Sequence, residues 1–175
     1  MVSMENYIFI KAKYGDVEEV YGLIIKRIKW MDKNEISQWN KTNYLDSYPK
    51  EYFEEKVTLE QLYVMKDSFS GKVAGAVVLL EEDRRWSMDR SKSYYIHNFV
   101  SDMQIRNVGT RIIVECEKMA IKKGKDRIRL DCQASNHKLN EYYHRLGFKS
   151  VGKVQDGSYA GIKREKKLTN YIKDR

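Results

Sequence analysis

The stretch Gln104-Ile105-Arg106-Asn107-Val108-Gly109-Thr110 follows a strand-like run that ends at Val100, and it opens a helix-like run near Asn107. The first backbone N–H groups of a helix have no acceptor within the helix and lie at its positive end. Such a turn suits an anion, and Gly109 removes a side chain where a phosphate would approach the backbone. We therefore predict a phosphate-binding turn, although an ordinary loop capped by Asn107 explains the same residues.

A second pattern lies about thirty residues further on, in the helix-like run 136–146. Asn136 and Tyr143 are two helical turns apart and therefore project on nearly the same side. Asn136 can cap the helix or bind an amide-bearing ligand, and Tyr143 can donate a proton. A core aromatic residue with a satisfied hydroxyl explains Tyr143 alone equally well, and Tyr142 is expected to pack. The order of the turn and the Asn–Tyr pair along the chain favours a functional site.

Composition predicts one folded domain over residues 1–175. The chain is 42% hydrophobic and 12% aromatic, with a single proline and no linker-like tract. This length and composition suit one globular core. No apolar run is long enough for a membrane span, and we expect no secretory signal at the N-terminus. Cys116 and Cys132 fall in core-like patterns, which predicts buried reduced thiols and a cytoplasmic location.

The net charge of +8 is unevenly distributed. Residues 121–175 contain 15 Lys/Arg and 6 Asp/Glu, a net charge of +9, which leaves the first 120 residues at −1. A basic C-terminal third could bind a polyanion or a phosphorylated cofactor. A solvated cationic surface explains the same residues equally well.

Hydrophobic periodicity and turn residues predict an alternation of strands and helices. The expected order is strand 7–10, a helix capped by Asp16, short helices within 30–56 broken near Pro49, strands 62–65 and 73–80, a charged loop 82–93, strand 94–100, helix 107–123, strand 127–132, helix 136–146, and strands 148–154 and 159–168. Alternation within 127–132 predicts one buried face. This mixed order predicts an α/β domain with a mixed sheet and helices on both faces.

The Rossmann fingerprint and the P-loop both fail to fit, because the required glycines and the Gly-Lys-Ser/Thr run are absent. Residues 100–148 instead resemble the GNAT superfamily of acetyl-CoA-dependent N-acetyltransferases. The family's Gln/Arg-x-x-Gly-x-Gly/Ala turn reads here Gln104-Ile105-Arg106-Asn107-Val108-Gly109. Its later Asn and Tyr-x-x-x-Gly-Phe read here as Asn136 and Tyr143-His144-Arg145-Leu146-Gly147-Phe148. Asn107 replaces the family's first glycine. Asn tolerates left-handed geometry, so the turn could survive, but pyrophosphate binding could be weaker.

The resemblance implies a single domain with a mostly antiparallel sheet, splayed where strand 94–100 parts from strand 127–132. The pantetheine arm of acetyl-CoA would lie in that gap, bound by the backbone of Phe99 and Val100. Residues 104–110 would bind the pyrophosphate, and Asn136 the arm or its sulfur end. Tyr143 would protonate the leaving thiolate of CoA. The implied reaction is direct transfer in a ternary complex, with strand N–H groups polarising the thioester carbonyl.

An amine must lose a proton before it attacks a thioester, so a general base is expected. His97 is one candidate, although it could equally face the core, and Glu81 and Glu82 are others. Neither cysteine lies where a covalent acetyl relay would need it, and no metal is expected. The acceptor pocket is expected from residues 30–56 and loop 82–93, whose aromatic and acidic side chains could favour a cationic amine. These residues are Trp30, Trp39, Tyr44, Tyr48, Trp86, Asp46, Glu51 and Asp83.

Three functions are compatible with the sequence. The favoured one is N-acetylation of a small amine, a peptide N-terminus or a lysine. A catalytically silent CoA-binding regulatory module is an alternative, because Asn107 departs from the family pattern. A basic nucleic-acid-binding protein is the other, and steep salt dependence of binding would identify it. An exposed terminal strand at 159–168 could pair across a homodimer. We expect no membrane partner.

Overall fold

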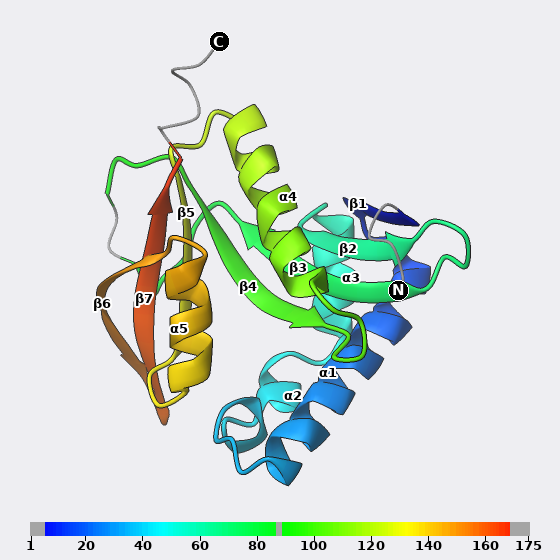
Figure 1. Ribbon diagram of the computed structural model, residues 1–175, viewed down its shortest axis with the longest axis horizontal. Helices are drawn as coiled ribbons and strands as arrows, with labels where there is room; N and C mark the ends of the chain where they lie inside the picture. The colour runs from blue at the N-terminus through cyan, green and yellow to red at the C-terminus, as the bar shows by residue number, and fades with distance from the viewer. Residues whose placement is uncertain (1–5, 87–88, 169–175) are drawn as a thin grey trace. The chain divides into compact units, whose positions relative to one another are not determined.

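The computed structural model describes residues 6–86 and 89–168. Its strands are β1 (Tyr7–Lys11), β2 (Leu62–Asp67), β3 (Val73–Leu80), β4 (Ser93–Ser101), β5 (Arg127–Gln133), β6 (Lys149–Asp156) and β7 (Tyr159–Lys167). Its helices are η2 (Tyr14–Asp16), α1 (Val17–Lys33), η3 (Trp39–Lys41), α2 (Tyr44–Ser47), α3 (Lys50–Thr58), α4 (Val108–Lys122) and α5 (His137–Arg145). The expected order of strands and helices is therefore confirmed, and Figure 1 shows these elements along the chain.

The strands form one seven-stranded sheet in the order β1-β2-β3-β4-β5-β7-β6. The pairs β1–β2, β2–β3, β5–β7 and β6–β7 are antiparallel, whereas β4 and β5 are parallel. Parallel neighbours need a crossover connection, and α4 lies between β4 and β5 in the chain. The predicted α/β class with a mixed, mostly antiparallel sheet is thus confirmed.

The chain divides into two compact units. The N-terminal unit contains residues 1–79 and 97–115, and the C-terminal unit contains residues 80–96 and 116–175. Strand β4 and helix α4 each contribute residues to both units. The prediction that residues 1–175 act as one domain stays a prediction.

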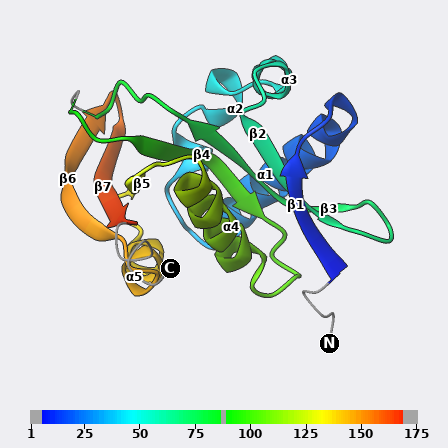
Figure 2. The same ribbon diagram turned by 90° about the horizontal axis from the view of Figure 1, so that it is seen from above.

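In the N-terminal unit, α1 presents its apolar stripe to the core, and Val17, Val20, Leu23 and Ile24 are all buried. Asp16 stands at the start of α1 as predicted, but its side chain makes no capping bond. Its carboxylate instead accepts the Lys13 N–H and the ammonium of Lys66, at 2.9 and 2.5 Å. The predicted break at Pro49 is confirmed, because Pro49 immediately precedes α3. Figure 2 shows α3 and α4 on opposite sides of β2 and β3.

The first half of α4 lies directly against β3 at Gly75. A Cβ atom at Gly75 would stand 2.6 Å from Ile112 Cδ1 and 2.9 Å from the Val100 carbonyl oxygen. These distances are shorter than ordinary van der Waals contact. A glycine is therefore required for the helix, β3 and β4 to approach so closely, and Val108 and Ile112 are fully buried as a result.

In the C-terminal unit, β7 pairs with β5 on one side and β6 on the other. The prediction that strand 159–168 is an exposed edge able to pair across a dimer is therefore wrong. The edge strand of this unit is β6, because the chain returns between β5 and β6 after the last hairpin. Order along the chain suggests that the last strand is outermost. Instead, the long antiparallel pairing of β7 with β5 gives β7 an inner place in the sheet.

Strand β5 also differs from the expected pattern. Ile128, Leu130 and Cys132 are buried as predicted, but Arg129 on the opposite face is only 3% exposed. The charge of Arg129 finds a partner among the residues that precede β4. Cys116 and Cys132 are both buried, and no disulfide joins them within the described residues.

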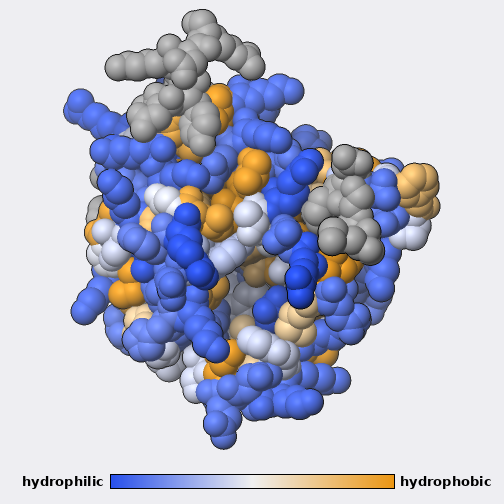
Figure 3. Space-filling view, viewed as in Figure 1, coloured by the Kyte–Doolittle hydropathy of each residue, from blue (hydrophilic) through white to orange (hydrophobic). Residues whose placement is uncertain are grey.

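The surface is polar, as a charged content of 33% requires. Hydrophilic side chains cover most of the face that Figure 3 displays, and apolar side chains form small separate groups there. Within residues 6–86 and 89–168, no helix has the length and apolar character that crossing a membrane requires. The expected absence of a secretory signal concerns the first residues, of which 1–5 lie outside the described chain.

Substitution of Gly75 by Ala tests the close approach of α4. We expect Gly75→Ala to lower the free energy of unfolding by about 1–3 kcal/mol, because the added methyl group meets side-chain and backbone atoms. Denaturant unfolding monitored by circular dichroism measures the change. Gly22→Ala is the matched control, since Gly22 lies in α1 and a Cβ atom added there would meet nothing within 4 Å. Gly22→Ala should raise the free energy of unfolding by about 0.5–1 kcal/mol, because alanine has the higher helix propensity. Equal effects of the two substitutions would contradict the packing argument.

Candidate functional site

The loop between β4 and α4 is anchored to β3. The Asp102 N–H donates to the Ala74 carbonyl at 2.7 Å, which extends the contact of the two strands by one residue. The Asp102 carboxylate then accepts the Gln104 N–H at 2.9 Å and shapes the turn that follows. The chain reverses within a few residues because of these bonds. Gln104 and Arg106 remain exposed at the tip.

Asn107 starts α4 in the left-handed conformation, with φ +66°. The Arg111 N–H donates to the Asn107 carbonyl at 2.9 Å, which makes Asn107 the N-cap residue. The backbone N–H groups of Val108 and Gly109 come before this first helical bond, so helix geometry gives them no acceptor within the helix. Asn is among the few residues that adopt positive φ at low cost. The turn therefore has a glycine-like backbone without a glycine at residue 107.

Burial separates the two sides of the turn. Val108 is fully buried and fixes the start of α4, while Asn107 is exposed and Gly109 is half-buried. Arg111, in the first turn of α4, pairs with Glu115 at 3.0 Å, one helical turn further on. Arg106, just before the helix, supplies an exposed positive charge beside the helix start. An exposed helix N-terminus with a neighbouring cation fits a phosphate group.

Strand β4 carries three of the predicted site residues in the N-terminal unit. Val100 is buried, and His97 and Phe99 are half-buried. Between them lies Asn98, which the sequence analysis missed. It is 9% exposed and has φ +49° within a strand. A non-glycine residue at positive φ in a strand is strained, and such strain is held by surrounding contacts.

Two tyrosines hold Asn98. Its side-chain amide donates to the Tyr44 hydroxyl at 2.6 Å and accepts from the Tyr52 hydroxyl at 2.9 Å. Burial raises the pKa of the Tyr44 phenol, so Tyr44 stays neutral. The spacing of Tyr44, Tyr48 and Tyr52 by four residues was the available signal, because it suits one helical face. That Tyr44 and Tyr52 share a partner on β4 could not be deduced from that spacing.

Four aromatic residues of 30–56, Trp39, Tyr44, Tyr48 and Tyr52, form one group of neighbouring rings. Ring centroids are separated by 4.4 Å for Trp39–Tyr44, 4.8 Å for Tyr44–Tyr48 and 5.0 Å for Tyr48–Tyr52. The other two predicted pocket aromatics are engaged by cations of the protein itself. Arg27 lies over Trp30, and both Arg129 and Lys163 lie over Trp86.

In the C-terminal unit, Asn136 caps α5, which is one of the two roles that the sequence allows for it. Its side-chain oxygen accepts the Leu139 N–H at 3.1 Å, which orients the amide group at the helix start. Tyr143 is 6% exposed, and its ring meets those of Tyr142 and Phe148 at 5.3 and 5.8 Å. Gly147 ends the helix at φ +91°, a conformation that glycine adopts without strain.

The predicted site residues therefore fall into two groups. Residues 97, 99–100 and 104–110 belong to the N-terminal unit, whereas Asn136 and Tyr143 belong to the C-terminal unit. Among the other candidates, Glu81 pairs with Lys125 at 3.3 Å, and Glu82 is exposed. Within loop 82–93, residues 87–88 lie outside the described chain.

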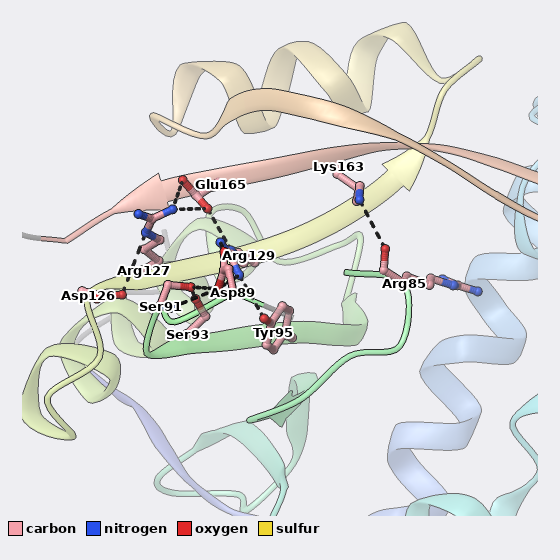
Figure 4. Close-up of polar contacts among 10 residues, drawn as sticks. All are labelled: Arg85, Asp89, Ser91, Ser93, Tyr95, Asp126, Arg127, Arg129, Lys163 and Glu165. Atoms are coloured by element: carbon pink, nitrogen blue, oxygen red, sulfur yellow. Dashed lines mark hydrogen bonds and ion pairs between the residues drawn. The ribbon is translucent and has the colours of Figure 1, made fainter. Parts of the chain in front are cut away.

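A charged network lies along β5 and β7 in the C-terminal unit (Figure 4). The Arg129 guanidinium donates to Glu165 at 2.8 Å, to Asp89 at 2.5 Å and to the Tyr95 hydroxyl at 3.0 Å. Arg127 donates to the same Glu165 carboxylate at 3.1 Å. Hydrogen bonds from Arg129, and then from Ser91, hold the pKa of Asp89 well below its usual range. The loop before β4 is thereby attached to β5 and β7.

Comparison with known proteins identifies the family. The model of the "Acetyltransferase (GNAT) family" matches residues 30–148, more than half of the chain. The chain belongs to the GNAT acetyltransferase family. This match includes the turn after β4 and the Tyr143-to-Phe148 motif, so the resemblance found in the sequence is confirmed. As a GNAT protein, the chain is an acetyltransferase.

Relatives of this GNAT protein are distant in sequence but similar in fold. An uncharacterized N-acetyltransferase, YesJ of Bacillus subtilis (strain 168), is 24% identical over 154 residues, which cover 83% of each chain. A GNAT-family acetyltransferase from Listeria monocytogenes 4b F2365 superposes with a TM-score of 0.75 at 24% identity, over 93% of this chain and 95% of the other. The PaiA N-acetyltransferase of Thermoplasma acidophilum, solved with coenzyme A, superposes with a TM-score of 0.72 at 20% identity. This match covers 92% of this chain and 98% of the other.

The charged network predicts a pH-dependent stability for this GNAT protein. The folded-state pKa of Asp89 lies below the unfolded value of about 3.9. Its contribution is therefore present above about pH 4 and is lost as the pH falls through the folded-state pKa. We expect Asp89→Asn to lower the urea midpoint at pH 7, and we expect the difference from wild type to shrink at pH 3. Asp46→Asn, on α2, is the control. A difference that stays constant with pH would rule out the ionised Asp89–Arg129 pair as its source.

Proposed function

We propose that this GNAT protein is an N-acetyltransferase that moves the acetyl group of acetyl-CoA to the nitrogen of an amine. The observation that carries the proposal is the turn after β4, where Asn107 starts α4 in the left-handed conformation. A pyrophosphate is the kind of anion that such a helix start accepts. The Thermoplasma relative of the same fold, solved with coenzyme A, supports this choice of ligand.

We propose a coenzyme-binding role for each predicted site residue, and we propose that residues 1–175 are one acetyltransferase domain. The backbone of Phe99 and Val100 binds the pantetheine arm, and Asn136 binds the arm or its sulfur end. Residues 104–110 bind the pyrophosphate through backbone N–H groups. Exposure of Gln104, Arg106 and Asn107 supports this role, since an anion from solvent can reach them.

The chemistry follows from the thioester that the donor supplies. The amine nitrogen attacks the carbonyl carbon, a C–N bond forms, and the C–S bond breaks. We assign to the Tyr143 phenol the proton that the departing sulfur takes up. Backbone N–H groups of β4 polarise the carbonyl oxygen. Burial raises the pKa of the Cys132 thiol to about 11, which supports direct transfer rather than a cysteine-bound acetyl group.

The amine must first give up a proton, and we propose His97 as the base. His97 lies on β4 one residue before Asn98, whose side chain is held by Tyr44 and Tyr52. The ion pair of Glu81 with Lys125 makes that carboxylate a weaker candidate. Aromatic residues of 30–56 line the acceptor site in this proposal. The acceptor is a small amine, a peptide N-terminus or a lysine.

The alternative functions are not favoured. Asn107, in place of the family's glycine, is the reason for considering a silent CoA-binding module. The φ of +66° at Asn107 instead supports a turn with a glycine-like backbone. No observation favours a nucleic-acid partner. Buried reduced cysteines support a cytoplasmic location. No metal is part of the proposed reaction.

A thiol-release assay tests the proposed function. Purified protein is incubated with acetyl-CoA and a broad panel of amines, peptides and lysine-bearing proteins, and free CoA is measured. We expect release that depends on one class of amine. Absence of CoA binding together with absence of release across the panel would refute the proposal.

Substitution of Tyr143 by Phe tests the proton donor. We expect kcat to fall by about 100-fold or more, with the affinity for CoA nearly unchanged, because only the phenolic proton is removed. Steady-state kinetics and calorimetric CoA titration give the two quantities. Tyr142→Phe, the adjacent aromatic residue on α5, is the matched control and should retain its kcat. If both variants keep full activity, Tyr143 is not the acid.

Substitutions of Asn107 test the phosphate turn. Because Asn107 already has a positive φ, Asn107→Gly should leave the dissociation constant for CoA within about threefold. Asn107→Ala should weaken binding more, since a left-handed alanine costs about 1–2 kcal/mol and the turn relaxes to avoid it. Calorimetry measures both constants. A large gain in affinity for Asn107→Gly would mean that the native turn is compromised.

A further inference from the structure

Arg164 lies in β7 and is 8% exposed. Its Nε and Nη2 atoms each donate to the Asn140 side-chain oxygen at 3.1 Å, and its Nη1 donates to the Phe148 carbonyl at 3.1 Å. All three bonds end on neutral oxygen atoms. The guanidinium therefore links the middle of α5 to the segment that follows the helix.

Asn140 carries this link onward to β5. Its side-chain nitrogen donates to the Gln133 carbonyl at 2.9 Å and to the Asn136 carbonyl at 3.0 Å. Its oxygen accepts from the Cys132 thiol at 3.3 Å in addition to Arg164. The side-chain amide thus makes bonds on both of its ends. The end of β5, the start of α5 and β7 are joined at this single residue.

Tyr143 lies between the two points that Arg164 holds. Asn140 is three residues before it on α5, and Phe148 is five residues after it. The Phe148 N–H donates to the Tyr143 carbonyl at 3.0 Å, and the two rings meet edge to face at 5.8 Å. Any shift of Asn140 or Phe148 relative to β7 would therefore move the Tyr143 ring.

The chemistry of Arg164 differs from that of its neighbours in β7. Glu165 is paired with Arg127 and Arg129, and Lys166 is paired with Glu117 at 2.7 Å. Within residues 6–86 and 89–168, no carboxylate forms an ion pair with Arg164. A buried charge without a counter-charge is costly, and an apolar side chain of similar volume is often at least as stable. A purely structural role would not require it.

We propose that Arg164 is a positioning residue for Tyr143. This inference rests on the proposed function, in which Tyr143 gives its proton to the departing thiolate. The planar guanidinium donates two hydrogen bonds to Asn140 and a third to Phe148. A flexible ammonium group cannot reproduce this fixed arrangement. Arg164 keeps the phenol where the proton is needed, and Asn140 is the acceptor that transmits this constraint to α5.

The test compares Arg164→Met, Arg164→Lys and the control Arg145→Met. Arg145 lies on α5 and is exposed, with only a loose ion pair at 3.9 Å to Glu141. We expect Arg164→Met to lower kcat by about tenfold or more with the KM for acetyl-CoA unchanged, because only alignment is lost. Arg164→Lys keeps the charge and should show a smaller loss, so it replaces Arg164→Met if that variant does not fold. Arg145→Met should behave as wild type.

A double variant separates positioning from general damage. If Arg164 acts through Tyr143, adding Arg164→Met to Tyr143→Phe produces no further fall in kcat. A further tenfold fall in the double variant, or a rise in KM for acetyl-CoA that accounts for the loss, would overturn the inference. In that case Arg164 merely supports the fold or the coenzyme site.

A spectroscopic readout does not depend on turnover. Ring-labelled tyrosine spectra, with the Tyr143 signal assigned from Tyr143→Phe, should show that signal displaced in Arg164→Met and unmoved in Arg145→Met. An unmoved signal in Arg164→Met overturns the inference. Failure of wild-type protein to acetylate any amine refutes the proposed function instead, and the tyrosine spectra still decide whether Arg164 positions the ring.

Discussion

The close approach of α4 to β3 at Gly75 is the constraint on which the phosphate turn depends. Val108 and Ile112 can be fully buried only because residue 75 has no side chain. Burial of Val108 fixes the first residue of α4, and β4 ends nearby in a loop bonded to Ala74. The chain must reverse between these two fixed points, which places Asn107 in the left-handed conformation. A packing requirement in the core thus determines the geometry of an exposed turn.

Buried charge is handled in two ways in the C-terminal unit. Arg129 is held by Glu165 and Asp89, so its charge is compensated and the loop before β4 is attached to the sheet. Arg164 is also buried, but its hydrogen bonds to Asn140 and Phe148 end on neutral oxygens, and no carboxylate pairs with it within the described chain. The first arrangement suits structural cohesion, because paired charges offset part of their desolvation. The second suits positioning, because three directed bonds specify where α5 lies.

Elements that depend on neighbouring residues could be predicted. The amphipathic pattern predicts α1, and the turns predict both hairpins. Gly124, which follows α4, has φ +68°, a conformation that glycine adopts without strain. Asn136 caps α5 because capping requires only the next three residues. The left-handed tolerance of Asn107 is likewise a property of the residue type. Much of the fold and the local backbone geometry at Asn107 and Asn136 were accessible in this way.

Contacts between distant residues were not predictable from the pattern. Asn98 is held by tyrosines 46 and 54 residues away, and Arg129 by carboxylates 36 and 40 residues away. The inner place of β7 depends on its register with β5, which no local signal encodes.

The sequence by itself determined the family, the order of the elements and the residue types able to bind a phosphate or donate a proton, because these depend on local spacing. Tertiary structure alone decided which polar groups are buried and what holds them. Such partners come from strands and loops brought together only by the packed sheet, where a buried polar group is stable only if it is bonded.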